Sequence, residues 1–184
     1  EAISKHFWNE KEKMFARMVT VEESGQLKQD MTADSSVIAL FTLGVFPADD
    51  ARLRATMQVV GQKLWVKVGV GGLARYEQDY YFRVTDDFAK VPGNPWIICT
   101  LWLADWYIAT AKRKEDLKSA LDLLEWASIC ALRTGVLSEQ VHPFTLQQLS
   151  VAPLTWSHAQ YVITATDYLD KLAELKKAEK SATG

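Results

Sequence analysis

The chain of 184 residues carries a formal net charge of -2 at pH 7 and is 48% hydrophobic and 24% charged. This balance is typical of an ordinary globular domain, and it lacks the surplus of Lys and Arg that marks a nucleic-acid partner. No apolar run reaches the ~18 residues of a membrane span, so no membrane partner is expected. The two cysteines, Cys99 and Cys130, lie in apolar helical patterns and favour buried free thiols over a disulfide framework.

The first part of the chain predicts helices separated by short polar breaks. Residues 1–18 carry apolar side chains at roughly helical spacing, and Asp34 caps a short apolar helix from Val37 to Phe46 that Pro47 stops. The next helix opens at Asp50. Its apolar residues recur at intervals of four, three and four, as in an amphipathic helix, at Leu53, Met57, Val60 and Leu64.

The second part alternates long loops with helices. Residues 69–93 are rich in glycine and tyrosine and predict a long aromatic loop, after which Asn94 is interpreted as a helix cap with Pro95 at the first helical position. Helices are expected over residues 96–112, 115–134 and from about 155 into a Lys-rich tail that should be flexible at 178–184. Five or six helices with little strand predict an all-α fold class for a single domain of residues 1–184, built from antiparallel helical hairpins.

The loop from Gly135 to His158 is the most informative stretch. A connection of this length is uncommon in a compact domain unless it binds something, closes a cleft or is disordered, and this loop is too apolar and too poor in charge for disorder. Its one acidic residue is Glu139. A carboxylate in apolar surroundings costs free energy unless it is hydrogen-bonded or paired, so Glu139 is a candidate functional residue.

Two blocks of sequence carry a resemblance to a known family. Ser-Glu-Gln at residues 138–140 and Leu-Thr-Trp-Ser at 154–157 resemble the segment around the catalytic base of the glucoamylases, glycoside hydrolase family 15. The other block resembles the family's substrate-arginine and aromatic segment, with Arg-Tyr at 75–76, Asp-Tyr at 79–80, Gly-Asn-Pro-Trp at 93–96 and Cys-Thr-Leu at 99–101. The blocks occur in the family's order, which is far more specific than one tripeptide.

The resemblance implies a barrel of six helical hairpins, an (α/α)6 toroid, of which this chain would form about half. That half would be the C-terminal part of the catalytic domain, with the long loops gathered at one end. The resemblance also implies an inverting glycoside hydrolase that releases glucose from α-linked glucosides without a cofactor or metal. Inversion uses a protonated carboxyl on the leaving oxygen and a carboxylate on a water, with the pair ~6.5–9.5 Å apart.

The family's motif residues carry over to particular positions of this chain. Glu139 matches the general base, which would activate the water. Arg75 matches the substrate-binding arginine, whose planar fork suits paired sugar hydroxyls, although a surface ion pair with its acidic neighbours is the alternative. The other matches near the sugar pocket are Tyr76, Asp79, Trp96 and Trp156. By contrast, Trp102, Trp106 and Trp126 are expected to be core residues.

The general acid is the residue that the sequence does not supply. In the family it follows a tryptophan in the first half of the barrel, and the nearest imitation here, Trp8-Asn9-Glu10, is interpreted as surface. The chain begins with Glu1 rather than Met and is expected to be a processed form or a fragment. Its expected partners are therefore an α-glucoside or oligosaccharide and the missing N-terminal half. On its own it should be inactive and should self-associate through exposed apolar faces.

Other functions and substrates stay open at this point. The alternative function is a non-catalytic carbohydrate-binding or scaffold module with the same helical fold, because helical barrels host several unrelated functions. The missing acid is the feature that separates the two. The sequence does not distinguish starch, dextran and trehalose linkages, and it leaves the compartment open, with the cytoplasm as the default.

Overall fold

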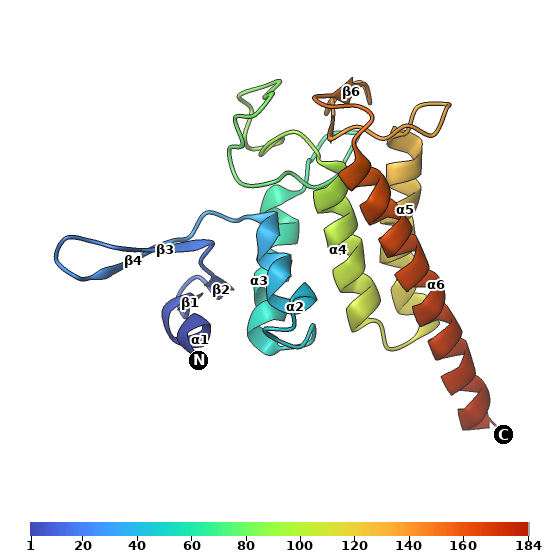
Figure 1. Cartoon of the computed structure of the whole chain (residues 1–184), viewed down its shortest axis with the longest axis horizontal. Coiled ribbons are helices and arrows are strands. Elements are labelled where there is room, and N and C mark those ends of the chain that lie inside the picture. Colours follow the sequence, from blue (N-terminus) through green and yellow to red (C-terminus); the bar gives the residue numbers. More distant parts are fainter. Residues whose placement is uncertain (184) are drawn as a thin grey trace.

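The structure is a computed structural model that describes the backbone of residues 1–183 and the side chains of residues 1–181. Small hairpins lie at its N-terminal side, helices make up its body, and two long loops cross one end of the helices (Figure 1). The helices are α1 (Ala2–His6), α2 (Ala39–Thr42), α3 (Ala51–Leu64), α4 (Ile97–Thr110), α5 (Lys118–Cys130) and α6 (Thr155–Thr183), with 3₁₀ turns η1 (Ser35–Ile38) and η2 (Lys114–Leu117) leading into α2 and α5.

Within residues 1–183, the strands form three separate antiparallel pairs and no larger sheet. They are β1 (Trp8–Asn9) with β2 (Met14–Phe15), β3 (Met18–Val21) with β4 (Leu27–Asp30), and β5 (Gln140–Val141) with β6 (Gln148–Leu149). The molecule is therefore mostly helical, and the prediction of an all-α fold is correct only for its body. The hairpins arise where turns fold short segments back on themselves.

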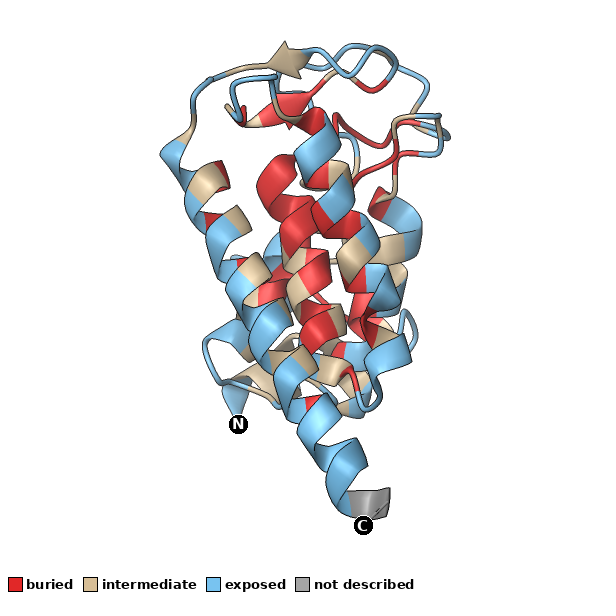
Figure 2. Ribbon diagram, turned by 90° about the vertical axis from the view of Figure 1, so that its right-hand side faces the viewer, coloured by how far each residue is buried: buried red, intermediate tan, exposed pale blue. Residues whose placement is uncertain are grey.

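Helix α4 is the central element of the fold. It packs against both α5 and α6 and against η1, and its residues from Ile97 to Ala104 are buried apart from Trp102, which is partly buried. The concentration of buried residues at the centre of the helices is visible in Figure 2. A helix that is enclosed on all sides needs apolar residues all round, which is why this segment shows almost no polar face. The sequence-based prediction that it is buried is confirmed.

Helix α3 confirms the prediction made from its apolar stripe. The side chain of Asp50 accepts hydrogen bonds from the backbone N–H groups of Arg52 and Leu53, at 2.9 and 3.3 Å, and so caps the helix. The stripe residues are among the most buried in the molecule: Leu53, Met57, Val60 and Leu64. The earlier cap at Asp34 is also confirmed, since its carboxylate accepts the backbone N–H of Ser36.

The helix predicted over residues 1–18 is wrong beyond α1. Asn9 accepts two backbone N–H groups of the following turn, and Lys13 adopts a left-handed φ of 53°, so the chain reverses between β1 and β2. Phe15 packs against Trp8 across the hairpin and against Phe46, with ring centroids 5.3 and 5.2 Å apart. The spacing of these apolar residues suggested a helix, but contacts across the hairpin and with a distant segment bury them instead. Such tertiary contacts override local helix propensity.

The cap predicted at Asn94 is also wrong. Its side-chain amide donates to the backbone oxygen of Phe82 at 2.7 Å and to Oε1 of Gln140 at 2.9 Å, and Trp96 occupies the cap position of α4. Asn94 therefore joins the two long loops, and the sequence offers no local signal of those partners. Buried amides are usually hydrogen-bonded, and here the partners happen to be remote.

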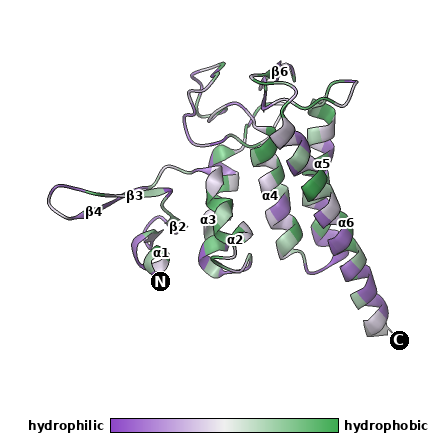
Figure 3. Ribbon diagram, in the orientation of Figure 1, coloured by the Kyte–Doolittle hydropathy of each residue, from purple (hydrophilic) through white to green (hydrophobic). Residues whose placement is uncertain are grey.

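Helix α6 begins where it was predicted and continues through most of the segment for which a flexible tail was expected. It runs to Thr183, and Lys114 forms an ion pair with Glu179 at 3.2 Å, while Gly184 lies outside the described residues. Figure 3 shows the lower half of this helix in hydrophilic colours. No helix among the residues described combines the length and the hydropathy of a membrane crossing.

Candidate active site

Two loops meet at the N-terminal end of α4, and backbone hydrogen bonds join them. The arginine loop (residues 73–96) precedes α4, and the glutamate loop (residues 135–154) precedes α6 (Figure 1). The N–H of Ile97 donates to the oxygen of Glu139 at 3.2 Å, and the N–H of Val141 donates to the oxygen of Pro95 at 2.9 Å. The two sequence blocks that carried the family resemblance are thus neighbours in space.

A pocket of about 380 Å³ lies beneath this junction. All predicted site residues except Asp79 line it, so the structure brings residues from both sequence blocks to one cavity. Its lining consists of Asp34, Ser35, Ser36, Arg75, Tyr76, Trp96, Ile98, Cys99, Trp102, Glu139 and Trp156.

Arg75 is held by a two-pronged ion pair with Asp79. Its Nε and Nη2 donate to the two carboxylate oxygens at 2.9 and 2.8 Å, and its guanidinium carbon lies 4.5 Å from the ring centre of Trp96. Burial lowers the pKa of Arg75, but the hydrogen bonds and charge of Asp79 outweigh it and leave the pKa raised. The remaining Nη1 has no hydrogen-bond partner among residues 1–181. A fixed cation with a spare donor suits a sugar hydroxyl.

Asp79 supports the pocket from behind. It is 1% exposed, and besides Arg75 it accepts the backbone N–H of Tyr81 at 3.0 Å. A Cβ on Gly93 would lie 2.9 Å from the Cβ of Asp79, so only glycine allows the loop to close over this carboxylate. Asp79 does not line the pocket, and its carboxylate instead holds the Arg75 guanidinium in place.

Glu139 presents a half-buried carboxylate to the pocket. Its Oε2 accepts the hydroxyl of Ser150 and, at 3.5 Å, the side-chain amide of Gln140, whereas Oε1 has no partner among residues 1–181. Its backbone is held on both sides, because its N–H also donates to the oxygen of Val151 at 2.9 Å. The carboxylate is thus anchored through one oxygen and open at the other, as proton abstraction from a water would require.

Tryptophans form another wall of the pocket. Trp156 is 53% exposed and packs edge-to-face on Trp102, with ring centroids 5.8 Å apart. Trp96 is 4% exposed, and its Nε1 has no partner among the described residues. Trp102 was expected in the core, and it does pack against the core, but it is only partly buried and also lines the pocket. A signal was available, because it follows Cys99 by three positions, which places these two residues on one face of α4.

The floor of the pocket includes a residue that sequence reasoning left out. Cys99 is 1% exposed, and burial raises the pKa of its thiol to about 12. Its sulfur accepts a hydrogen bond from the hydroxyl of Ser35 at 3.1 Å. The thiol is therefore protonated at neutral pH and is no nucleophile. Ser35 and Asp34 enter the site only through the fold, since the backbone N–H of Ser35 donates to the oxygen of Arg75.

A family model described as glycosyl hydrolases family 15 matches residues 2–166, a span that takes in both loops and the whole pocket. The chain belongs to glycosyl hydrolase family 15. Within the described residues of this family 15 chain, no group of three or more histidine, cysteine or acidic side chains is placed to hold a metal.

Relatives of this family 15 chain include an uncharacterized hydrolase and an enzyme named for its activity. It is 30% identical over 171 residues to an uncharacterized glycosyl hydrolase of Methanocaldococcus jannaschii, a match that covers 88% of this chain and 25% of that protein. It is 31% identical over 150 residues to the isomaltose glucohydrolase of Kribbella flavida, covering 76% and 34%.

A solved structure supports the family assignment at the level of the fold. The crystal structure of a bacterial glucoamylase complexed with acarbose superimposes with a TM-score of 0.66 and 26% identity, over 84% of this chain and 23% of that one. The chain spans 25% and 34% of the two sequence relatives. It therefore corresponds to one part of proteins several times as long.

Proposed function

We propose that this chain supplies the catalytic base and part of the sugar pocket of an inverting, glucoamylase-like glucosidase. The observation that carries the proposal is the position of Glu139. Its half-buried carboxylate, open at one oxygen, lines the same pocket as the Arg75 guanidinium and the exposed face of Trp156. Sugar rings stack on aromatic faces, and their hydroxyls accept hydrogen bonds from a fixed guanidinium.

In the proposed mechanism, the pocket residues divide the work between binding and proton transfer. The spare Nη1 of Arg75 and the indole of Trp156 hold the terminal glucose. Glu139 then removes a proton from a water that attacks the anomeric carbon on the face opposite the leaving oxygen. Remote sugar contacts lower the barrier only where they strengthen in the transition state.

The proton for the leaving oxygen must come from another carboxyl group. Asp34 is the other acidic residue of the pocket lining, but it caps η1 and lies 3.7 Å from the guanidinium of Arg17. We therefore assign the acid to the part of the family 15 domain outside this chain. That part would complete an (α/α)6 barrel of which this chain forms about half. The gathering of both long loops at one end of the helices supports this arrangement (Figure 1).

The stereochemistry of the product tests the proposal. The enzyme that contains this chain together with the acid-bearing part of the barrel is mixed with maltotriose, and the anomeric protons of the released glucose are followed by NMR. An inverting enzyme releases β-glucose first, before mutarotation mixes the anomers. Release of α-glucose would overturn the base role of Glu139. If no glucose appears, isomaltose and trehalose are the next substrates, and a failure on all three favours the alternative below.

The alternative is a carbohydrate-binding module without catalysis. One observation favours it, namely that the chain contains the Arg75 and tryptophan contacts but not the acid. Acarbose binding to the isolated chain separates the cases when it is combined with turnover by the assembled enzyme. Binding together with turnover supports the glucosidase, whereas binding without turnover on any α-glucoside supports the module.

A further inference from the structure

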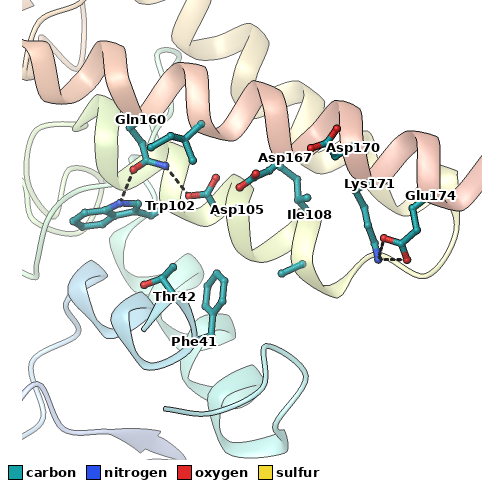
Figure 4. A pocket seen from close by; sticks show the side chains of 12 residues that line it. Phe41, Thr42, Trp102, Asp105, Ile108, Gln160, Asp167, Asp170, Lys171 and Glu174 are labelled. Carbon is teal, nitrogen blue, oxygen red and sulfur yellow. Dashed lines mark hydrogen bonds and ion pairs between the residues drawn. The ribbon is translucent and has the colours of Figure 1, made fainter. Parts of the chain in front are cut away.

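A second hollow adjoins the candidate active site. It has a volume of about 700 Å³, lies between α2, α4 and α6, and meets the sugar pocket at Trp102, which lines both cavities (Figure 4). Its acidic lining distinguishes it from the sugar pocket. From α4 comes Asp105, and from α6 come Asp167, Asp170 and Glu174, together with Lys171.

Within this hollow, a chain of hydrogen bonds runs from Asp105 to Trp102. The side-chain N–H₂ of Gln160 donates to Oδ2 of Asp105 at 2.8 Å, and the hydroxyl of Thr164 donates to Oδ1 at 2.6 Å. The oxygen of the same Gln160 amide accepts the indole N–H of Trp102 at 3.2 Å (Figure 4). Helices α4 and α6 are thereby joined by a polar network that ends at a wall of the sugar pocket.

The donor and acceptor groups of the network determine which way the Gln160 amide is turned. An ionised carboxylate only accepts hydrogen bonds, so Asp105 turns the donor end of the Gln160 amide toward itself. The amide oxygen must then face Trp102, whose indole N–H can only donate. Trp102 is the residue on which Trp156 packs edge-to-face. The orientation of both tryptophans thus depends on a carboxylate that lies outside the pocket.

We propose that Asp105 is a positioning residue that fixes the Trp102–Trp156 wall of the sugar pocket through Gln160. Asp105 does not line the sugar pocket and has no catalytic role in this proposal. Its effect on sugar binding rests on the proposed function above, whereas its effect on Trp102 does not. The two parts are therefore measured separately.

The ionisation of Asp105 provides a readout of the network. Burial raises the pKa of this carboxyl to about 6, hydrogen bonds from Thr164 and Gln160 oppose the rise, and the like charge of Asp167 adds to it. The other charged groups that line the hollow come from α6, and α2 contributes only Phe41 and Thr42. Between about pH 5 and 7, Asp105 changes from a group that can donate to one that only accepts.

The experiment records the indole N–H signals of the ¹⁵N-labelled 184-residue chain against pH. The Trp102 signal, assigned with Trp102→Phe, should titrate with a midpoint near the Asp105 pKa of about 6. In Asp105→Asn the titration should disappear and the indole signal should move, because an asparagine amide no longer dictates how Gln160 is turned. The matched control is Asp167→Asn, which removes an equal charge from the same hollow. In this variant the Trp102 signal should still titrate, but with its midpoint at a lower pH, because the like charge that raises the Asp105 pKa is lost.

Acarbose affinity supplies the functional half of the test, measured by titration of the same three proteins. Asp105→Asn should weaken binding about fivefold, the cost of one lost hydrogen bond, while Asp167→Asn should bind like the parent. If Asp105→Asn behaves as Asp167→Asn in both measurements, the positioning role is wrong. If the 184-residue chain does not bind acarbose, the comparison is repeated in the enzyme that also contains the acid-bearing part of the barrel. Failure to bind there as well overturns the sugar-binding part of the proposed function, and the indole titration alone then decides the positioning role.

A second variant keeps the proposal testable if Asp105→Asn does not fold. Gln160→Met replaces the connecting amide with an apolar chain of similar length and leaves Asp105 in place. It should abolish the Trp102 titration and move the indole signal. A Trp102 signal that still titrates in Gln160→Met would overturn the assignment of Gln160 as the connection.

Discussion

Asp79 and Glu139 are both carboxylates on long loops of the same site. They differ in whether a carboxylate oxygen remains without a hydrogen-bond partner in the folded chain. Asp79 is 1% exposed and directs both oxygens to Arg75 and a backbone N–H. Glu139 is half-buried and keeps one oxygen without a partner in the described chain. An unpaired acceptor is free to take a proton from water, so the contrast supports the proposal that Asp79 is structural and Glu139 is the base.

This difference shows why residue type and family motif do not settle a role. Both carboxylates fall in segments that resemble the family's sugar site, and both were candidates on that ground. The number of hydrogen bonds that each accepts separates them. A fully paired buried carboxylate contributes rigidity, because removing it would leave its donors unpaired at a cost of about 1–3 kcal/mol.

The largest expected effect is on turnover in Glu139→Gln. Glutamine keeps the size of the side chain and loses the ability to accept a proton from water. The kcat of the assembled glucosidase should fall about 10²- to 10⁴-fold, while acarbose affinity and the urea midpoint stay close to those of the parent. Steady-state kinetics and urea unfolding measure both. Retained turnover would remove Glu139 from the mechanism and with it the contrast with Asp79.

The next effect is on stability, in Asp79→Asn. Asparagine can accept one of the hydrogen bonds from Arg75 but cannot neutralise its charge. Removing one partner of a fully buried ion pair costs about 3–5 kcal/mol, and Arg75 is partly exposed, so we expect a loss of about 2 kcal/mol in the free energy of unfolding. Urea unfolding of this variant beside Glu139→Gln gives the comparison directly. Equal stability of the two variants would contradict a structural role for Asp79.

A smaller effect is expected for Arg75→Lys. Lysine keeps the positive charge near Asp79 but has neither the two-pronged geometry nor the flat face that lies over Trp96. Sugar affinity should fall about tenfold, as expected for the loss of one hydrogen bond to a charged group. Acarbose titration measures this. An unchanged affinity would mean that the guanidinium fork only holds the loop together.

The smallest effect is expected for Ser150→Ala. This change removes the hydroxyl that donates to Oε2 of Glu139 and leaves the Gln140 amide as its side-chain partner. We expect kcat to fall about fivefold with little change in stability, the value of one typical hydrogen bond, because the Gln140 amide still donates to the same oxygen. Pre-steady-state glucose release is the appropriate measurement. A loss as large as that of Glu139→Gln would show that Ser150 takes part in the proton transfer itself.

The helical body was predictable because its signals are local. The stripe of α3, its cap at Asp50 and the all-apolar α4 each reflect contacts that helical spacing alone specifies. The hairpins at the N-terminal side were not predictable in this way. Their apolar residues satisfy a helical spacing equally well, and the choice is made by remote contacts such as Phe15 with Phe46.

The sequence predicted some of the residues that line the pocket, but not the hydrogen bonds that hold them. Family motifs led to Arg75 and Glu139, and the structure places both on one pocket. Residues far apart in the sequence determine which carboxylate is fully hydrogen-bonded within the protein. They also determine which tryptophan forms a wall of the pocket. The Asn94 amide is the clearest case, since a pattern typical of a helix cap serves instead to join two loops.

The backbone hydrogen bonds between Ile97 and Glu139 and between Val141 and Pro95 have an evolutionary consequence. They fasten the bases of both loops to the first turn of the central helix, while residues 83–86 and 142–147 make none of these hydrogen bonds and lie farther along the loops. Substitutions and insertions in these two segments can therefore accumulate without displacing the carboxylate. Under the proposed function, such variation would alter which glucosidic linkage is accepted while the position of the base is kept.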